Sequence, residues 1–198
     1  MTYIDEGYIK FNLVWKKAKP FSSKVIEELI YWRDVCIKKE DIGYNYIQKV
    51  GYGNISERQD DTGFIISGSQ TGHIIKSNAD IFTKVTDCKL ESNTVICEGP
   101  IKASSESMTH FACYASDKNI NAVIHIHNKK AWSKYKGLLP TTPANIRYGT
   151  IEMANAIKKL TNEGAKAIIM DGHKDGLVFV GQSLDEAGSR YLELIEQV

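Results

Sequence analysis

Two histidines separated by one residue are the part of this sequence with the clearest capacity for chemistry. His125 and His127 end a stretch that begins Ala122-Val123-Ile124, whose β-branched residues favour a strand. Residues two apart on a strand project from the same face, so the two imidazoles would stand side by side, with Cα atoms about 7 Å apart. Imidazoles so placed can bind one metal ion at about 2 Å from each nitrogen. We therefore expect a metal site at the end of this strand, whereas a single histidine would indicate only a half-buried strand residue.

The composition is that of an ordinary globular protein. A chain of 198 residues suits one domain, or one domain with a small appendage. With a formal net charge of +1, neither nucleic acid nor an acidic membrane is expected as a partner. No apolar run approaches the roughly 18 residues of a membrane span, and residues 1–19 lack the apolar core of a signal peptide. The cysteines form no C-x-x-C pair, so reduced thiols and a cytoplasmic location are expected.

Strands and helices must position the histidine pair, and both can be predicted from local patterns. Ser22 or Ser23 can cap the first helix, and Ser183 with Glu186 forms a capping box before the last one. The expected helices are 22–39, 104–115, 130–136, 151–160 and 184–197. The expected strands are 51–58, 64–67, 81–86, 94–97, 122–127, 165–170 and 176–180, with a further strand or extended arm at 9–15. Their irregular alternation predicts a single α/β domain with a mixed central β-sheet between helical layers.

Two short polar segments could act on a ligand beside the pair. Residues 67–72, Ser-Gly-Ser-Gln-Thr-Gly, bring backbone N–H groups and hydroxyls together, which can bind an anion, although such loops are common. Glu106 follows Ser104 and Ser105 at a helix start, where the helix dipole favours a first-turn glutamate without any catalytic role. Neither segment indicates a function by itself.

The surroundings of the pair exclude three common kinds of His-x-His metal site. A cupin-like site would place a glutamate a few residues later, where this chain has Asn128-Lys129-Lys130-Ala131-Trp132. A metallo-β-lactamase-like site would continue into Asp-His, which is absent here. An amidohydrolase barrel would place the pair early in a much longer chain.

Further motifs follow one another in a recognisable order. They are Gly53-Asn54-Ile55-Ser56-x-Arg58, Thr71-Gly72, Ser104-Ser105-Glu106 with His110, the strand that ends in His125 and His127, and His173 with Gly176-Leu177-Val178-Phe179-Val180-Gly181-x-Ser183-Leu184-x-Glu186-Ala187. Taken together, this ordered set resembles the class II aldolase/adducin family and covers about residues 23–198. The resemblance implies a three-layer fold for 23–198, with 1–22 as an N-terminal arm or strand. It also implies a homo-oligomer, most often a tetramer, with active sites between subunits.

The resemblance also implies a set of site residues. In the family, the His-x-His pair and one later histidine bind a divalent metal, usually zinc, with manganese, cobalt or iron as alternatives. Here the ligands would be His125, His127 and His173, and Glu106 would move protons. The family's phosphate-binding positions correspond to Gly53, Asn54, Thr71, Gly72, Ser104 and Ser105.

The implied function is that of a metal-dependent lyase (an aldolase) that acts on a small phosphorylated sugar or hydroxy-carbonyl compound. A metal-stabilised enediolate would form as the C–C bond breaks. Alternatives are a sugar-phosphate dehydratase, a 4-epimerase, and a non-catalytic adducin-like binding protein. The family's tyrosine acid has no assigned match, although Tyr135 and Tyr148 are available. His73 and His110 compete with His173 as third ligand, but His73 follows the expected phosphate loop and His110 lies one helical turn after Glu106.

Overall fold

A computed structural model describes residues 7–61 and 63–198 of the chain. The described strands are β1 (Asn12–Lys17), β2 (Gly43–Asn45), β3 (Val50–Tyr52), β4 (Asn54–Arg58), β5 (Phe64–Ser67), β6 (Phe82–Lys89), β7 (Thr94–Gly99), β8 (Ala122–His127), β9 (Ala167–Met170) and β10 (Gly176–Gly181). The α-helices are α1 (Glu27–Lys38), α2 (Ser107–Ser116), α3 (Lys129–Tyr135), α4 (Ile151–Asn162) and α5 (Leu184–Ile195), with short 3-10 helices at Ser23–Val25 and Ala79–Ile81.

Eight of these strands form one mixed sheet, which confirms the predicted α/β fold. Their order is β1-β7-β6-β5-β4-β8-β10-β9, and β2 and β3 form a separate hairpin. Only β1 and β7 are parallel, while every other neighbouring pair in the sheet is antiparallel. The strand with the histidine pair, β8, lies between β4 and β10 near the middle of the sheet.

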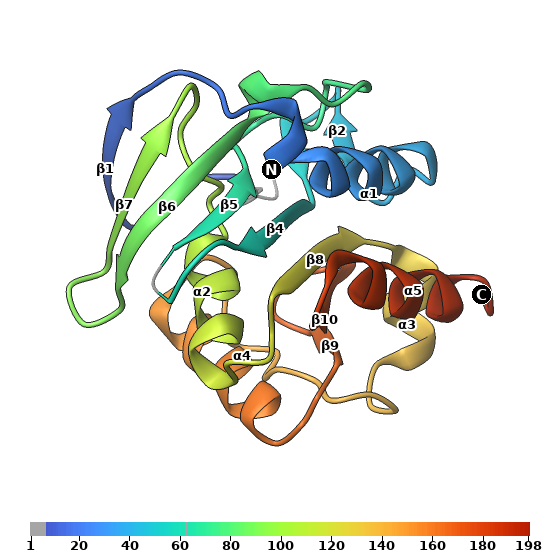
Figure 1. The fold of residues 1–198 in the computed structure, drawn as a ribbon. Helices are drawn as coiled ribbons and strands as arrows, with labels where there is room; N and C mark the ends of the chain where they lie inside the picture. The colour runs from blue at the N-terminus through green and yellow to red at the C-terminus, as the bar shows by residue number, and fades with distance from the viewer. Residues whose placement is uncertain (1–6, 62) are drawn as a thin grey trace.

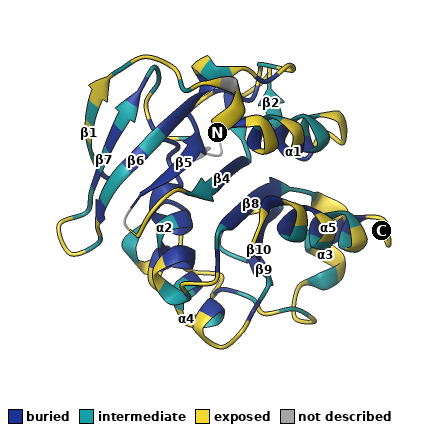
Figure 2. Ribbon diagram, in the orientation of Figure 1, coloured by how far each residue is buried: buried dark blue, intermediate teal, exposed yellow. Residues whose placement is uncertain are grey.

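Two apolar cores cover the two faces of the sheet, and β8 contributes to both. Val123 packs in the core that contains residues of α2 and α4, whereas Ile124 and Ile126 pack in the core that contains residues of α1 and α5. Figure 1 shows these helix pairs on opposite sides of the sheet, and Figure 2 shows β8 buried along its length. Burial on both faces explains the apolar character of the strand, and the two-residue period sends its histidines to the α2 side.

Predictions about helix starts need two corrections. The first helix is not capped by Ser22 or Ser23: residues 23–25 form a 3-10 turn, and α1 begins at Glu27 after Ile26, which makes no side-chain cap bond. Ile26 itself is buried in the apolar core. Glu106 is the residue before α2 and not part of its first turn.

Two other local predictions are confirmed in part. Ser183 Oγ accepts the Glu186 N–H at 3.1 Å at the start of α5, as in a capping box, but the Glu186 carboxylate accepts the N–H of Gln182 and not that of Ser183. The predicted strand 51–58 is two strands, because Gly53 adopts a left-handed φ of +72° between β3 and β4. A side chain at Gly53 would also crowd Ile42, with a Cβ at 2.7 Å from its Cγ1.

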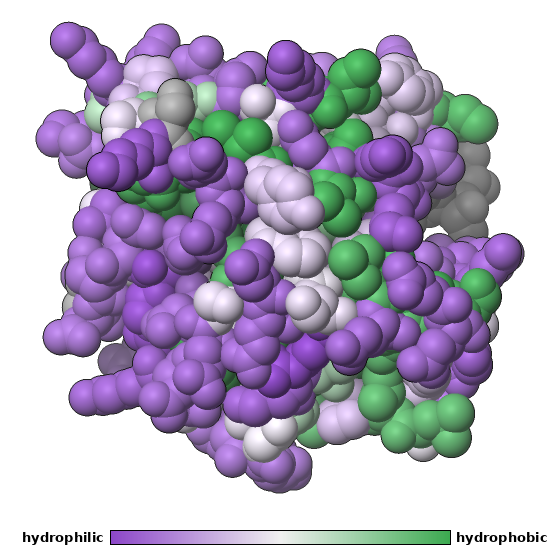
Figure 3. All heavy atoms as spheres, turned by 45° about the vertical axis from the view of Figure 1, so that its right-hand side comes forward, coloured by the Kyte–Doolittle hydropathy of each residue, from purple (hydrophilic) through white to green (hydrophobic). Residues whose placement is uncertain are grey.

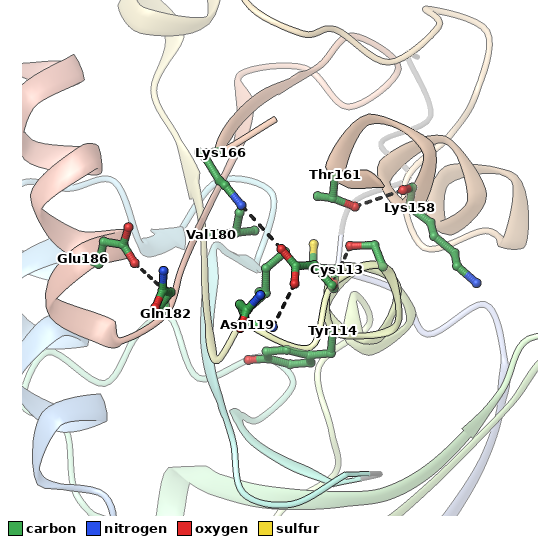
Figure 4. A network of polar contacts seen from close by, with 12 residues as sticks. Cys113, Tyr114, Asn119, Lys158, Thr161, Lys166, Val180, Gln182 and Glu186 are labelled. Carbon is green, nitrogen blue, oxygen red and sulfur yellow. Dashed lines mark hydrogen bonds and ion pairs between the residues drawn. The ribbon is translucent and has the colours of Figure 1, made fainter. Parts of the chain in front are cut away.

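The surface of the described residues is mixed, and the sheet end away from the histidines carries polar contacts. On the face drawn in Figure 3, apolar side chains form separate patches among hydrophilic ones. Near the start of β8, Lys166 pairs with Asp117 at 3.7 Å and Glu186 accepts the Gln182 N–H. Figure 4 shows Lys166, Gln182 and Glu186 in this polar region. Within residues 7–61 and 63–198, no helix is long and apolar enough to cross a membrane.

Candidate metal and substrate site

Three histidines meet at the end of β8. His125 and His127 leave the strand on one face, and His173 lies in the turn between β9 and β10. Because Gly176 at the start of β10 pairs with His127, that turn is adjacent to the end of β8. One ligand atom from each imidazole lies within 4.8 Å of the other two. The predicted pair and the predicted third histidine are therefore brought together.

Glu106 approaches two of these imidazoles from the start of α2. Its Oε2 lies 2.7 Å from His125 Nε2, and its Oε1 lies 3.3 Å from His173 Nδ1. The other ring nitrogen of His125, Nδ1, donates to the Leu177 carbonyl oxygen at 2.9 Å, because a carbonyl can only accept. With Nδ1 as the donor, His125 turns its Nε2 toward the Glu106 carboxylate, where both atoms could bind one metal ion. A donor set of three imidazoles and one carboxylate suits a divalent transition metal.

The pKa shifts of Glu106 and His127 favour, in these two residues, the protonation states that metal binding needs. Burial alone would raise the pKa of Glu106, but the charges of His125 and His173, with their hydrogen bonds, hold that pKa well below its usual range. Removal from water, followed by repulsion from His173 and His125, holds the pKa of His127 well below its usual range. An ionised glutamate and a neutral imidazole result at pH 7, and both can coordinate a metal.

A polar cavity opens beside this cluster. Glu106, His125 and His173 line it, together with all six residues predicted to bind phosphate: Gly53, Asn54, Thr71, Gly72, Ser104 and Ser105. Asn54 Nδ2 donates to Glu106 Oε2 at 3.4 Å, and Ser104 Oγ accepts the Glu106 N–H at 3.2 Å. The site can therefore present a carboxylate, hydroxyls and backbone N–H groups to one small ligand.

The two competing histidines lie elsewhere. His73 is exposed, with its Nδ1 3.0 Å from the Gln70 carbonyl oxygen. His110 is fully buried, and its Nδ1 lies 2.6 Å from Ser56 Oγ. Neither belongs to the three-histidine cluster or lines the cavity.

Tyr148 is a residue of the site that the sequence did not assign. It lines the cavity, and its ring stacks on His173 with centroids 4.6 Å apart. The N-terminal segment covers it: Tyr8 N–H donates to Tyr148 Oη at 3.1 Å, and Lys10 Nζ donates to the Tyr148 carbonyl oxygen at 3.0 Å. Tyr135, the other candidate, bonds the Leu194 carbonyl oxygen on the far side of α3. Tyr148 lies in an irregular loop without periodicity, so spacing gave no signal for it.

Comparison with known proteins identifies the family. A family model described as "Class II Aldolase and Adducin N-terminal domain" matches residues 39–198. The chain belongs to this family. No curated protein sequence matches it.

Solved structures of class II aldolase-like proteins share the fold. An L-fuculose 1-phosphate aldolase is 24% identical over 90% of this chain and 84% of its own, with a TM-score of 0.68. The L-fuculose-1-phosphate aldolase from Thermus thermophilus is 20% identical over 88% and 91% of the two chains, with a TM-score of 0.68. A sugar-phosphate aldolase from Thermotoga maritima is 16% identical over 87% and 91%, with a TM-score of 0.67. At sequence identities of 24% or less, the similarity to these proteins shows a shared fold.

Proposed function

We propose that this family member is a metal-dependent carbon–carbon lyase of the aldolase type, acting on a small phosphorylated sugar or a related hydroxy-carbonyl compound. The observation that carries the proposal is the placement of Glu106 between His125 and His173 at the wall of a polar cavity. His125, His127 and His173 would hold the divalent ion. Zinc suits three imidazoles best, and manganese, cobalt and iron are the ions to compare with it.

Each part of the site has a role in such a reaction. When bound, the metal ion would stabilise negative charge that develops on the substrate's oxygen atoms as the C–C bond breaks. Glu106, held ionised beside the imidazoles, can take a proton from a substrate hydroxyl and return it to carbon. The hydrogen bond from His125 Nδ1 to Leu177 fixes the ring so that Nε2 faces the cavity side.

The substrate's phosphate would lie at the other end of the cavity. Ser104 and Ser105 lie just before Glu106, the residue that precedes α2, and the N–H groups and dipole of a helix start favour an anion. The facing loop supplies backbone N–H groups, including that of Gly72, and Asn54 adds an amide, whereas the Thr71 hydroxyl donates to the Gly68 carbonyl oxygen at 2.9 Å and holds the loop in shape. Backbone and hydroxyl donors of this kind can hold a phosphate without a cluster of basic side chains.

We extend the proposal to the organisation of the protein. Residues 23–198 form the functional domain and 1–22 an N-terminal arm, since every proposed site residue lies between Gly53 and His173. The active form is a cytoplasmic homo-oligomer, most simply a tetramer, as in other enzymes of this family.

The decisive experiment is to incubate the protein, loaded with each metal in turn, with a panel of ketose and aldose phosphates and to identify the products by mass. Retro-aldol cleavage gives two smaller carbonyl compounds, dehydration gives a loss of water, and epimerisation gives an unchanged mass. Glu106→Gln should keep the metal and lose on the order of 10²–10⁴ in turnover. Glu98→Gln, which removes a carboxylate paired with Lys16 at the sheet edge, should leave turnover unchanged. An active Glu106→Gln variant would exclude the proposed proton transfer.

A further inference from the structure

A buried arginine lies behind the loop that would bind the phosphate. Arg33, on α1, is fully buried, which is rare for arginine unless it is paired. Its Nη2 donates to the Thr71 carbonyl oxygen at 2.8 Å, and its Nη1 donates to the Ile74 carbonyl oxygen at 3.0 Å and to Ser77 Oγ at 2.8 Å. Within the described residues no carboxylate forms an ion pair with it. A buried charge is destabilising unless it is offset, and Arg33 has the charge of Asp34 nearby but no direct ion pair, so an anion bound in the cavity would offset its burial further.

Arg33 is positively charged at neutral pH. Burial lowers its pKa to about 10, and the nearby charge of Asp34 opposes that effect. The described residues that line the cavity include no lysine or arginine. The positive charge of Arg33 is therefore available to an anion in the cavity through the loop that separates them.

The hydrogen bond to Thr71 orients the loop. A trans peptide places its C=O and N–H groups on opposite sides, so the Gly72 N–H points away from Arg33 while the Thr71 carbonyl points toward it. Among the described residues, the backbone N–H groups of Gln70 and Gly72 form no hydrogen bond with a protein acceptor, whereas residues 69–70 form a hydrogen-bonded turn that ends at Thr71. Gln70 adopts a left-handed φ of +61°, as in the turns whose successive N–H groups form anion-binding concavities.

The loop cannot easily move away from this position. A side chain at Gly72 would place its Cβ 1.8 Å from the Gly43 carbonyl oxygen, so the loop and the β2 strand are in direct backbone contact. Asp34 Oδ1 accepts the Ser77 N–H at 2.9 Å and fixes the far end of the loop to the same helix. Arg33 and Asp34 of helix α1 therefore hold the Thr71–Gly72 peptide and the rest of this loop in one position.

We propose that Arg33 is a positioning residue for phosphate recognition: its guanidinium fixes the Thr71–Gly72 peptide with the N–H group toward the ligand and supplies the counter-charge for the bound anion. This rests on the proposed function, in which the cavity holds the substrate's phosphate group. A purely structural role would instead affect stability alone.

The chain offers a matched control for that alternative. Arg58 likewise donates three hydrogen bonds, all of them to backbone carbonyls, those of Ile120, Tyr114 and Asp117, at 2.9, 2.8 and 3.2 Å. Those carbonyls lie at the C-terminal end of α2 and at the start of β8, and Arg58 does not line the cavity. Arg58→Met removes a comparable set of bonds without touching the loop.

The test is calorimetric titration of the metal-loaded protein with inorganic phosphate. Arg33→Met and Arg33→Gln should each bind phosphate at least about tenfold more weakly than the wild type, with unchanged metal content, and Arg33→Lys should recover part of the loss. Arg58→Met should lower the unfolding midpoint and keep wild-type phosphate affinity. With an active phosphorylated substrate, Arg33→Gln should raise KM far more than it lowers kcat.

Three results would decide against the inference. Wild-type phosphate affinity in Arg33→Met overturns it, and if the Met variant does not fold, wild-type affinity in Arg33→Gln overturns it equally. Equal losses of affinity in Arg33→Met and Arg58→Met would reduce Arg33 to a structural role. A wild-type protein that binds no phosphate removes both this inference and the proposed phosphate site, whereas lyase activity is tested separately by the product assay.

Discussion

The buried His110 should make the folded protein sensitive to mild acid. Burial lowers the pKa of His110 to about 3, opposed by the charge of Glu106 and assisted by that of His125. In the unfolded chain a histidine has a pKa near 6.5. Below that value the unfolded chain binds a proton that the folded chain excludes, so stability falls as the pH falls from about 6.5 toward 3.

The size of this effect follows from the two pKa values. Each pH unit within that interval changes the free energy of unfolding by about 1.4 kcal/mol, so the step from pH 7 to pH 5 removes about 2 kcal/mol. That is a large fraction of the roughly 5–15 kcal/mol that stabilises a typical domain. His110 alone accounts for this loss of about 2 kcal/mol between pH 7 and pH 5.

Urea unfolding at pH 7, 6 and 5 tests the reasoning, with a chelator present so that metal release does not contribute. His110→Asn keeps a polar atom near the Nδ1 position, within reach of Ser56 Oγ. This variant should be less stable than the wild type at pH 7 but should lose about 2 kcal/mol less between pH 7 and pH 5. His73→Asn, which removes an exposed imidazole, should follow the wild-type profile. Parallel losses in the wild type and His110→Asn would refute the argument.

Two further predictions concern the proposed metal site and assembly. His173→Ala should lose metal as completely as His125→Ala, whereas His73→Ala should keep it, because His73 lies outside the three-histidine cluster and does not line the cavity. Metal analysis of the folded variants tests this, and metal loss only in His73→Ala would reverse the assignment. Light scattering should give a homo-oligomer, and a fully active monomer at micromolar concentration would contradict the proposed assembly.

The local features of the fold and site could be predicted because they depend on short-range geometry. The alternation of β8 places both histidines on one face with a period of two residues, whatever the rest of the chain does. The capping box at Ser183 is equally local. The position of His173 could be predicted as well, because a turn between two strands lies at the ends of those strands, where its side chains can reach the end of a neighbouring strand.

The missed features depend on contacts between distant segments. Tyr148 reaches the site through its stacking on His173 and its contact with Lys10, neither of which leaves a sequence pattern. Arginine on an amphipathic helix is normally an exposed, charged residue, so Arg33 is not expected to be buried. It shares a helical stripe with Leu29 and Cys36, at spacings of four and three, and that stripe is buried because the loop after β5 folds over it. The spacing was a usable signal, but the residue type argued against it.

The alternation along β8 also links strand register to metal content. A shift of one residue against β4 and β10 would send Ile124 and Ile126 to the site and put the imidazoles among the apolar side chains under α1 and α5. A chain paired in that wrong register could not assemble the proposed three-histidine site. The ratio of metal to protein in a preparation would therefore count the correctly paired molecules, and adding the metal during refolding would draw the population toward them by mass action.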